Sequence, residues 1–377
     1  MKNKGVSKNL KSLSFGGVGE AFEEDMKILI IQQKMIGDVL TSGILFEALR
    51  NQYPDAELHY LINSHTYPVV QHNPFIDKFH FFTSNEEKSK TALIDFAKTI
   101  RDEHFDAVVD VYSKLSSNLI TLYSNAKIRI SKYKWYSSFI YSHTFKELTK
   151  PTTNAGLAIE NRLRLLQPLN VNETVIAPKI YLTDEEKDNA RTYLINNGIQ
   201  LKKPLFMIGL LGSGENKTYP FRYMAKVIDW IAEEKPDCQI LFNYIPKQEK
   251  DARAIYELCE EKTKALIYFD VFGNSLREFM SITSYCTALI GNEGGATNMA
   301  KALGVSTFTI FSPWIYKEVW NVFVDGSKHV SVHLNDYKPE LFIGKTESQL
   351  KKQSLKLYPH FEPELFEEAL KSYLNAI

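Results

Sequence analysis

The stretch LIGNEGGATNMAKALGVSTFTIFSP, residues 289–313, decides the fold class. An apolar strand is followed by two adjacent glycines, a short helix and a second apolar strand, which together predict a compressed β-α-β unit. Gly294, Gly295 and the Thr297 hydroxyl would stand at the helix N-terminus, where free N–H groups and the helix dipole favour pyrophosphate. Glu293 would accept hydrogen bonds from vicinal sugar hydroxyls. The alternative is a glycine-rich turn with a surface glutamate.

The same alternation of short apolar runs and longer helical patterns continues on both sides and predicts an α/β protein with parallel strands. A helix is expected after the first strand, because apolar residues between 40 and 49 fall on one face at a spacing of 3.6 residues. Strands are expected at 26–32, 56–62, 78–82 and 106–111 in the first half, and at 205–211, 238–244, 265–270, 287–291 and 306–311 in the second. The sequence therefore predicts two similar sheets.

A chain of 377 residues is too long for one ordinary core, so we expect two domains with a cleft between them. The boundary is placed near residue 175, because residues 171–186 hold few helix formers, contain Pro178 and end in a helix-start pattern. The expected parts are a flexible, partly basic lead-in (1–25), an N-terminal domain (26–175), a C-terminal domain (176–345) and a helical segment (346–377).

Composition and motif absences narrow the function classes. The 45 basic and 45 acidic residues cancel, which gives no overall argument for a nucleic-acid partner. Three cysteines without CxxC spacing suggest neither a disulfide framework nor a zinc site and fit a reducing cytoplasm. We expect no membrane-spanning helix and no signal peptide, since no apolar run is long enough. The sequence contains no DxD or HExxH motif, so we expect no metal site.

The first of three strand-turn-helix junctions is IIQQKMIGDVLTSGI, residues 30–44. In open parallel sheets ligands bind beyond the carboxyl ends of the strands, so these junctions are the best site candidates. Gly37 allows a tight turn, and Asp38 stands at the start of the helix. Asp38 is either an N-cap that accepts a backbone N–H or a general base that faces the cleft.

The second junction is MIGLLGSGENKTYP, residues 207–220. Glycines after an apolar strand suggest that the backbone comes close to another group or takes a positive φ, and the group predicted here is a phosphate. Gly212, Ser213 and Gly214 would present N–H groups, while Lys217 adds positive charge and Thr218 a hydroxyl. An ordinary solvated loop is the alternative. GxxxxGK[ST] and GxGxxG are both absent, which disfavours magnesium-dependent nucleotide triphosphatases and dinucleotide oxidoreductases.

A basic and aromatic segment, KIRISKYKWYSSFIYSHTFK (127–146), bears on the acceptor. Lysines such as Lys132 and Lys134 attract anionic headgroups and phosphorylated sugars, while Trp135 and its aromatic neighbours favour a membrane interface. Asp110 and Lys114 would stand at a strand end beside this segment. We expect the segment to dock a lipid-anchored acceptor; an aromatic surface loop or a dimer contact is the alternative.

Three motifs together resemble those of glycosyltransferase family 9, the ADP-heptose:lipopolysaccharide heptosyltransferases. They are Ile36-Gly37-Asp38 after the first strand, Lys217-Thr218-Tyr219-Pro220 before a helix, and Gly291-Asn292-Glu293-Gly294-Gly295 before Ala300–Val305. Their order, spacing and position agree with the family over most of the chain. The resemblance implies a GT-B fold, in which two Rossmann-like domains face each other, the C-terminal one holding the nucleotide sugar and the N-terminal one the acceptor.

The resemblance also implies the reaction. It is metal-independent, inverting transfer of a heptose from an ADP-sugar, without a cofactor, to a Kdo or heptose hydroxyl of the lipopolysaccharide inner core. The acceptor would be a lipid A–Kdo glycan, and the enzyme would be cytoplasmic and peripheral at the cytoplasmic face of the inner membrane. In GT-B proteins a terminal helix often returns to the first domain, so residues 346–377 are expected to pack there.

Several residues match the family position by position. Asp38 matches the catalytic base, Lys217 the lysine at the donor phosphates, and Glu293–Thr297, with Ala296, the donor loop. Glu249 falls loosely where the family often has an acidic residue near the ribose. Gly37, Asp110, Lys114, Lys132, Lys134 and Trp135 are the residues expected on the acceptor side.

The donor loop departs from the family pattern Asp-[Ser/Thr]-Gly-x-x-His. The aspartate becomes Glu293 and the histidine becomes Asn298, whose amide forms hydrogen bonds but carries no charge. Two alternatives to a heptosyltransferase therefore stay open. One is a protein that binds a nucleotide sugar without turning it over, and the other is a related transferase that uses a different nucleotide sugar.

Overall fold

The computed structural model describes residues 26–171 and 175–377 and contains two six-stranded sheets in which every strand pair is parallel. The predicted α/β class is therefore confirmed. The predicted lead-in, residues 1–25, lies outside the described residues. The first sheet has the order β3-β2-β1-β4-β5-β6. Its strands are β1 (Lys27–Ile31), β2 (Glu57–Asn63), β3 (Lys78–Phe82), β4 (Ala107–Asp110), β5 (Ile128–Lys132) and β6 (His143–Phe145).

The second sheet repeats this arrangement with the order β12-β11-β10-β7-β8-β9. Its strands are β7 (Leu205–Gly209), β8 (Gln239–Asn243), β9 (Ile267–Tyr268), β10 (Ala288–Asn292), β11 (Ser306–Ile310) and β12 (His329–Val332). The β-α-β unit predicted from residues 289–313 is confirmed, because β10 and β11 pair in parallel and a single helix connects them.

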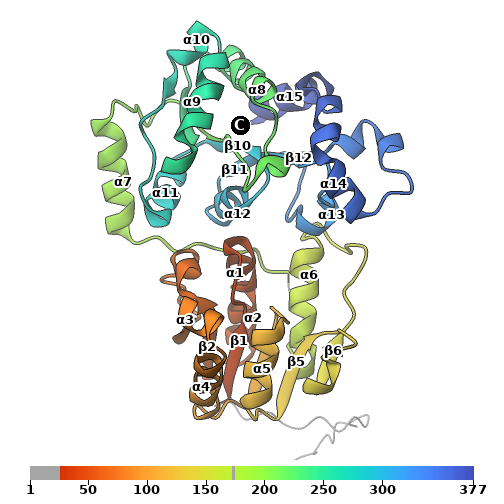
Figure 1. Cartoon of the computed structure of the whole chain (residues 1–377). Coiled ribbons are helices and arrows are strands. Elements are labelled where there is room, and N and C mark those ends of the chain that lie inside the picture. Colours follow the sequence, from red (N-terminus) through yellow and green to blue (C-terminus); the bar gives the residue numbers. More distant parts are fainter. Residues whose placement is uncertain (1–25, 172–174) are drawn as a thin grey trace, which may run out of the picture.

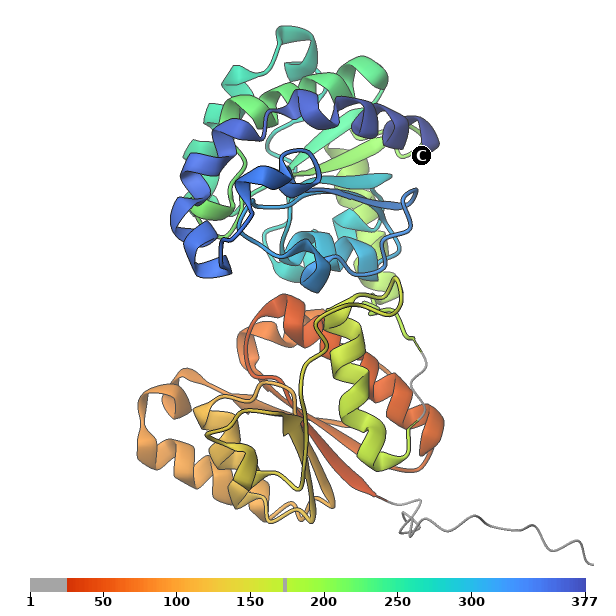
Figure 2. The same cartoon turned by 90° about the vertical axis from the view of Figure 1, so that its right-hand side faces the viewer.

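The two sheets and their helices form two units that lie one above the other (Figure 1). A view from the side shows the same stacking (Figure 2). The helices of the first unit are α1 (Ile36–Ser42), α2 (Ile44–Gln52), α3 (Ser84–Lys88), α4 (Lys90–Arg101), α5 (Leu115–Tyr123) and α6 (Leu157–Leu163). Those that follow are α7 (Asp184–Asn196), α8 (Phe221–Glu234), α9 (Glu249–Leu258), α10 (Glu261–Lys264), α11 (Leu276–Thr283), α12 (Gly295–Ala302), α13 (Lys317–Trp320), α14 (Glu347–Leu357) and α15 (Glu367–Ala376). None of the described helices combines the length and hydropathy that crossing a bilayer requires.

Both faces of each sheet are covered, which explains why the strands read as continuous apolar runs. In the first unit, side chains such as Leu29 and Val108 pack with α4 and α5, whereas Ile28 and Ile30 pack on the opposite side with α1, α2 and α6. The cluster that contains Ile28 continues into the second unit. One apolar core therefore runs through both units.

Three details of the secondary structure differ from the predictions. The single helix expected near residues 40–49 is two helices, α1 and α2, which meet at Gly43. The strands expected from the sequence do not include the edge strands β6 and β12, which have only three and four residues and mix polar with apolar side chains. The strand expected at 265–270 is reduced to Ile267–Tyr268.

The expectation that residues 346–377 pack on the first unit is wrong. Helices α14 and α15 pack on the second unit, where α15 contacts α8. Leu350, Phe366 and Leu370 are buried there in one cluster with side chains of β7, β8 and β11, and the Tyr219 hydroxyl donates a hydrogen bond of 2.5 Å to the Phe361 carbonyl. The physical reason is that the terminal helices complete the cover of an apolar face of the second sheet.

Several contacts join the two units. Helix α1 packs on α12, and α6 packs on α13. The Arg277 guanidinium forms an ion pair with Glu186 and donates to the Pro68 carbonyl of the first unit at 3.0 Å. The Ile180 N–H of the connecting segment donates to the Ala302 carbonyl at 3.1 Å. These contacts bring the turn after β1 against the turn after β10.

Candidate active site between the two units

Two of the predicted junctions meet where α1 contacts α12. A Cβ placed on Gly37 would lie 3.1 Å from the Asn298 amide nitrogen, which is tighter than an ordinary van der Waals contact. Gly37 therefore allows the start of α1 to approach α12 closely. Asp38, the next residue, lies directly beside this contact.

Asp38 is not an N-cap, so that reading of the residue is wrong. The N-cap of α1 is Met35, and no described side chain caps the helix start. One oxygen of Asp38, Oδ1, accepts a hydrogen bond of 2.5 Å from Nη2 of Arg162. The side chain is 21% exposed and faces a cavity. Its second oxygen can therefore accept a proton or a hydrogen bond from a ligand in that cavity.

Arg162 is a functional candidate that the sequence reasoning missed. It is buried on α6 and donates hydrogen bonds to three partners. Nε donates to Ser42 Oγ at 3.0 Å, Nη1 to the Ala158 carbonyl at 2.7 Å, and Nη2 to Asp38. A planar guanidinium fixed at three points holds the carboxylate in one orientation. The signal in the sequence was the place of Arg162 in residues 157–166, three or four positions from apolar residues on both sides and hence on the apolar face of a helix, since a buried arginine needs a partner.

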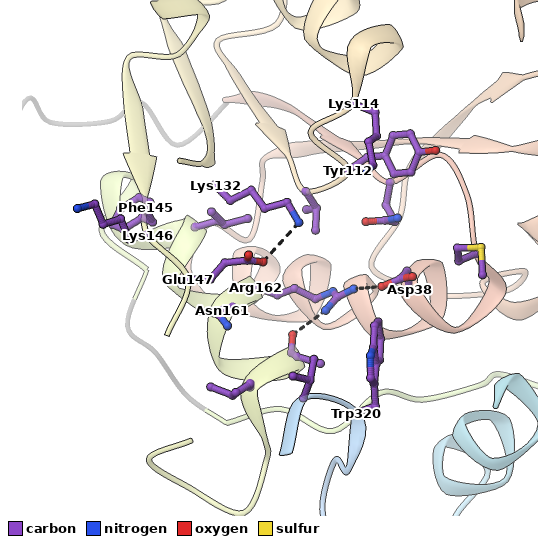
Figure 3. A pocket seen from close by; sticks show the side chains of 17 residues that line it. Asp38, Tyr112, Lys114, Lys132, Phe145, Lys146, Glu147, Asn161, Arg162 and Trp320 are labelled. Atoms are coloured by element: carbon purple, nitrogen blue, oxygen red, sulfur yellow. Dashed lines mark hydrogen bonds and ion pairs between the residues drawn. The ribbon is translucent and has the colours of Figure 1, made fainter. Parts of the chain in front are cut away.

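A cavity of about 300 Å³ opens beside this pair (Figure 3). The cations that line it are Lys114, Lys132, Lys146 and Arg162, and the carboxylates are Asp38 and Glu147. Lys132 pairs with Glu147 at 3.4 Å, whereas Lys114 and Lys146 form no ion pair with any carboxylate in the described ranges. The cavity is therefore basic and suits a polar, anionic ligand.

Of the residues predicted on the acceptor side, Lys114 and Lys132 line this cavity, but Asp110 does not. Asp110 is fully buried, its Oδ1 accepts from the Ser113 N–H at 2.7 Å, and its Oδ2 accepts from the Tyr141 hydroxyl at 2.6 Å. Burial raises the pKa of its carboxyl group. The prediction that Asp110 binds the acceptor is wrong, because the carboxylate holds the chain after β4 to the segment before β6.

Lys134 and Trp135 also lie outside the cavity. Lys134 donates to the Ser113 carbonyl, and Trp135 is 80% exposed. Together with Tyr133, Tyr136 and Phe139 they form an exposed loop, residues 133–139, which we call the aromatic loop. The expectation that these two residues contact the acceptor glycan directly is therefore corrected, because their side chains lie on the surface that borders the cavity.

The glycine-rich loop after β7 forms hydrogen bonds between its own residues. The Gly212 N–H donates to Thr218 Oγ1 at 3.1 Å, and Thr218 Oγ1 donates to the Gly214 carbonyl at 2.9 Å. A Cβ on Gly212 would lie 2.3 Å from the Lys217 carbonyl oxygen. The close approach that the glycine signalled is therefore to the loop's own backbone, and the Gly212 N–H is not free for a phosphate. Ser213, Gly214 and Thr218 line a cavity of about 200 Å³ beside Gln248.

Lys217 was predicted to bind the donor phosphates and Glu293 the donor sugar, and the two side chains lie next to each other. The Lys217 ammonium is 3.2 Å from Glu293 Oε1 and 5.4 Å from the centre of the Trp314 ring. Glu293 is only 10% exposed, so the pair is partly desolvated. Glu249, in contrast, is 56% exposed and pairs with Arg253 on its own helix at 3.4 Å. No contact in the described chain connects Glu249 with the Lys217–Glu293 pair.

The start of α12 has the geometry predicted for an anion site. Gly294 has φ +152 and nothing within 4 Å of an added Cβ, so its turn is open on that side. No side chain of the described residues caps this helix, and Gly295 and Ala296 follow in its first turn. Thr297 is buried, and its hydroxyl donates a hydrogen bond of 3.3 Å to the Asn292 carbonyl. The hydroxyl oxygen can therefore accept a hydrogen bond from a ligand but cannot donate one. Within the described chain, no three or more His, Cys, Asp or Glu side chains gather as a metal site would require.

A second cavity lies within the second unit, at the start of α12. It measures about 30 Å³ and is lined by Glu293, Gly294, Thr297, Asn298, Lys301 and Trp320, among others. Trp320 also lines the basic cavity, where Figure 3 shows it beside the Asp38–Arg162 pair. Trp320 is thus a wall of both the cavity that holds Asp38 and the cavity at the donor loop.

The model of glycosyltransferase family 9 (heptosyltransferase) matches residues 93–338, more than half of the chain. The chain belongs to this family. It is 22% identical over 294 residues to lipopolysaccharide heptosyltransferase 1 of Campylobacter coli, a match that covers 76% of this chain and 84% of the relative. The protein is therefore a glycosyltransferase of the heptosyltransferase family, as the three motifs predicted.

Solved structures show the same fold. A glycosyl transferase of family 9 from Veillonella parvula superposes with a TM-score of 0.73 at 16% identity, over 94% of this chain and 99% of the other. ADP-heptose lipopolysaccharide heptosyltransferase II of Escherichia coli gives a TM-score of 0.64 at 14% identity, over 89% and 99%. The GT-B architecture expected from the resemblance is confirmed.

Replacing Gly212 tests the role of the loop's backbone. We expect Gly212→Ala to lower the free energy of unfolding by about 1–3 kcal/mol, because the new Cβ overlaps the Lys217 carbonyl. Denaturant titration measures the loss. Gly214→Ala is the matched control, since its nearest contact would be an ordinary 3.5 Å and its backbone is extended. Equal stability of both variants would show that the loop yields without cost.

Proposed function

We propose that this enzyme transfers a heptose from ADP-heptose to a Kdo or heptose hydroxyl of the lipopolysaccharide inner core, with inversion and without a metal ion. The observation that carries the proposal is the Asp38 carboxylate, which Arg162 orients in a basic cavity that shares Trp320 with the cavity at the donor loop. Inverting displacement needs a base, an aligned acceptor and stabilisation of the leaving group.

The donor assignment draws on the relatives. Heptosyltransferase II of Escherichia coli, which shares this fold, is described as an ADP-heptose enzyme. In this chain the free N–H groups of the α12 start and the Lys217 ammonium would hold the diphosphate, and Glu293 would accept hydrogen bonds from the sugar. The ion pair between Lys217 and Glu293 keeps both side chains in place until the donor binds.

The acceptor assignment rests on charge. Inner-core sugars carry carboxylates, and Lys114 and Lys146, which form no ion pair in the described ranges, line the cavity that also holds Asp38. A carboxylate bound there would bring a neighbouring hydroxyl to the second oxygen of Asp38. Asp38 would then accept the hydroxyl proton as the oxygen attacks the anomeric carbon.

We also propose that the aromatic loop touches the cytoplasmic face of the inner membrane. Trp135 and Phe139 are about 80% exposed, and Leu115 at the start of α5 is 84% exposed. The loop follows Lys132, which lines the cavity, so an acceptor anchored in the bilayer would enter the cavity while its lipid stays in the membrane. Aromatic side chains beside lysines favour an anionic lipid interface.

Removing the base tests the mechanism. Asp38→Asn should reduce kcat by about 10²–10⁴-fold, because the amide cannot accept the acceptor proton, while ADP affinity stays unchanged. Transfer of radiolabelled heptose to a purified Kdo-lipid acceptor gives kcat, and calorimetry gives ADP affinity. A wild-type chain that binds ADP-heptose but transfers nothing would instead identify a binding protein, the alternative that the Glu293 and Asn298 departures left open.

A ligand screen tests the donor base. A ligand that binds the folded state raises the melting temperature by mass action. We expect ADP-sugars to raise it more than GDP-, UDP- and dTDP-sugars at equal concentration, measured by differential scanning fluorimetry. An equal response to all four nucleotides, or a larger response to another, would overturn the ADP assignment.

Vesicle binding tests the membrane contact. The double variant Trp135→Ser, Phe139→Ser should sediment less than the wild type with vesicles of phosphatidylethanolamine and phosphatidylglycerol, because it removes two exposed aromatic side chains. Ile343→Ser is the matched control, since Ile343 is 78% exposed but lies in the second unit. Equal sedimentation of all three proteins would contradict a role of the loop at the membrane.

A further inference from the structure

A partly buried lysine stands in α12, the helix that follows the donor loop, and is not among the site residues predicted from the sequence. Lys301 lies in the last turn of α12 and is partly buried. Its ammonium donates to the Val322 carbonyl at 2.6 Å and forms no ion pair with a carboxylate in the described part of the chain. A lysine in such surroundings carries a charge that a neutral carbonyl balances only in part.

The position of Lys301 connects two cavities. It lines the small cavity of about 30 Å³ together with Glu293, Gly294 and Asn298. It also lines a cavity of about 310 Å³ between the units, together with Asn298 and Thr41 of α1. Helical side chains point back toward the helix N-terminus, so the long stem of Lys301 runs toward the anion site at Gly294.

At the proposed donor site, a nucleoside diphosphate needs more positive charge than Lys217 and the helix start supply. A nucleoside diphosphate that departs from a sugar carries at least two negative charges, but Glu293 already partners Lys217 at 3.2 Å. Asn298, beside the start of α12, cannot carry charge. The helix start supplies only about half an elementary charge. Lys301 is the remaining cation that lines the same cavity as the donor loop.

We propose that Lys301 is the second cation of the donor site and binds the diphosphate of the nucleotide sugar. The inference rests on the proposed function. During transfer, the bond between the anomeric carbon and the β-phosphate oxygen breaks while the acceptor oxygen bonds to that carbon. The acceptor proton passes to Asp38, and the bonding electron pair leaves with the nucleoside diphosphate, whose added charge the Lys301 ammonium offsets.

The surroundings of Lys301 predict how its charge depends on pH. Burial lowers the pKa of its ammonium to about 8, against a smaller opposing effect of Asp325. The other charged groups that line these cavities are Glu293 in the small one and Asp325 and Lys328 in the larger one, where burial lowers the pKa of His329 to about 4 and keeps it neutral. Two helices that pack on α12 also carry charged groups. Helix α1 carries Asp38, which is bonded to Arg162. Helix α11 carries Arg277, which donates to Glu186, and Glu278, which accepts from the Asn274 N–H. The ammonium is charged below this pKa and loses its proton above it.

Two substitutions separate charge from packing. Lys301→Met keeps the buried stem and removes the charge, and we expect kcat/KM for the ADP-sugar to fall by about 10- to 100-fold with weaker ADP binding in calorimetry. Lys301→Arg keeps a permanent charge. The wild type should lose kcat/KM as pH rises through about 8, because free-enzyme groups govern this parameter, and the arginine variant should not.

The control and the contrary outcomes are distinct. Lys328→Met is the matched control, because Lys328 lines only the larger cavity and is exposed. If Lys301→Met kept wild-type kcat/KM and ADP affinity, the proposal would be overturned. If Lys301→Met did not fold, an unchanged decline above pH 8 in Lys301→Arg would overturn it as well. A wild type without transfer activity would refute the proposed function, whereas ADP affinity still reports on Lys301.

Discussion

The contact between the starts of α1 and α12 is the constraint on which the rest of the site depends. Parallel strands end at one edge of each sheet, so two such sheets stacked edge to edge bring two sets of strand-end residues together. Here the approach is so close that Gly37 has no room for an unstrained Cβ against Asn298. The missing side chain of Gly37 therefore lets the Asn298 amide lie against the start of α1, directly beside Asp38.

The sequence predicted what depends on local order and missed what depends on contacts far apart. Asp38 and Gly294 were found because each follows an apolar strand and begins a helix. Arg162 was missed because its bond to Asp38 joins residues 124 positions apart. The prediction for Asp110 was wrong for the same reason. Its carboxylate accepts a hydrogen bond from the Tyr141 hydroxyl, which lies in a different connection between strands. The edge strand β6 was missed because its three residues carry no clear alternation.

The glycine at position 212 indicated correctly that the backbone lies close to another group, but it did not indicate which group. Gly212 was predicted to make room for a phosphate, yet the group it faces is the Lys217 carbonyl of its own loop. The functional consequence is indirect, because the tight loop fixes the backbone of Lys217 and hence the ammonium beside Glu293. Gly294, whose added Cβ would meet no atom within 4 Å, borders open space where a ligand can bind.

The size of the donor cavity implies movement during the reaction. About 30 Å³ between Glu293, Asn298 and Trp320 holds one or two water molecules, not a sugar. Under the proposed function, a donor sugar bound there would shift Trp320 or separate the units, as domains of two-unit enzymes do around their ligands. The segment that carries Trp320 also carries the Val322 carbonyl that holds Lys301. A shift of this segment that made room for the sugar would therefore also move the Val322 carbonyl, and the proposed diphosphate could then take its place as the partner of the Lys301 ammonium.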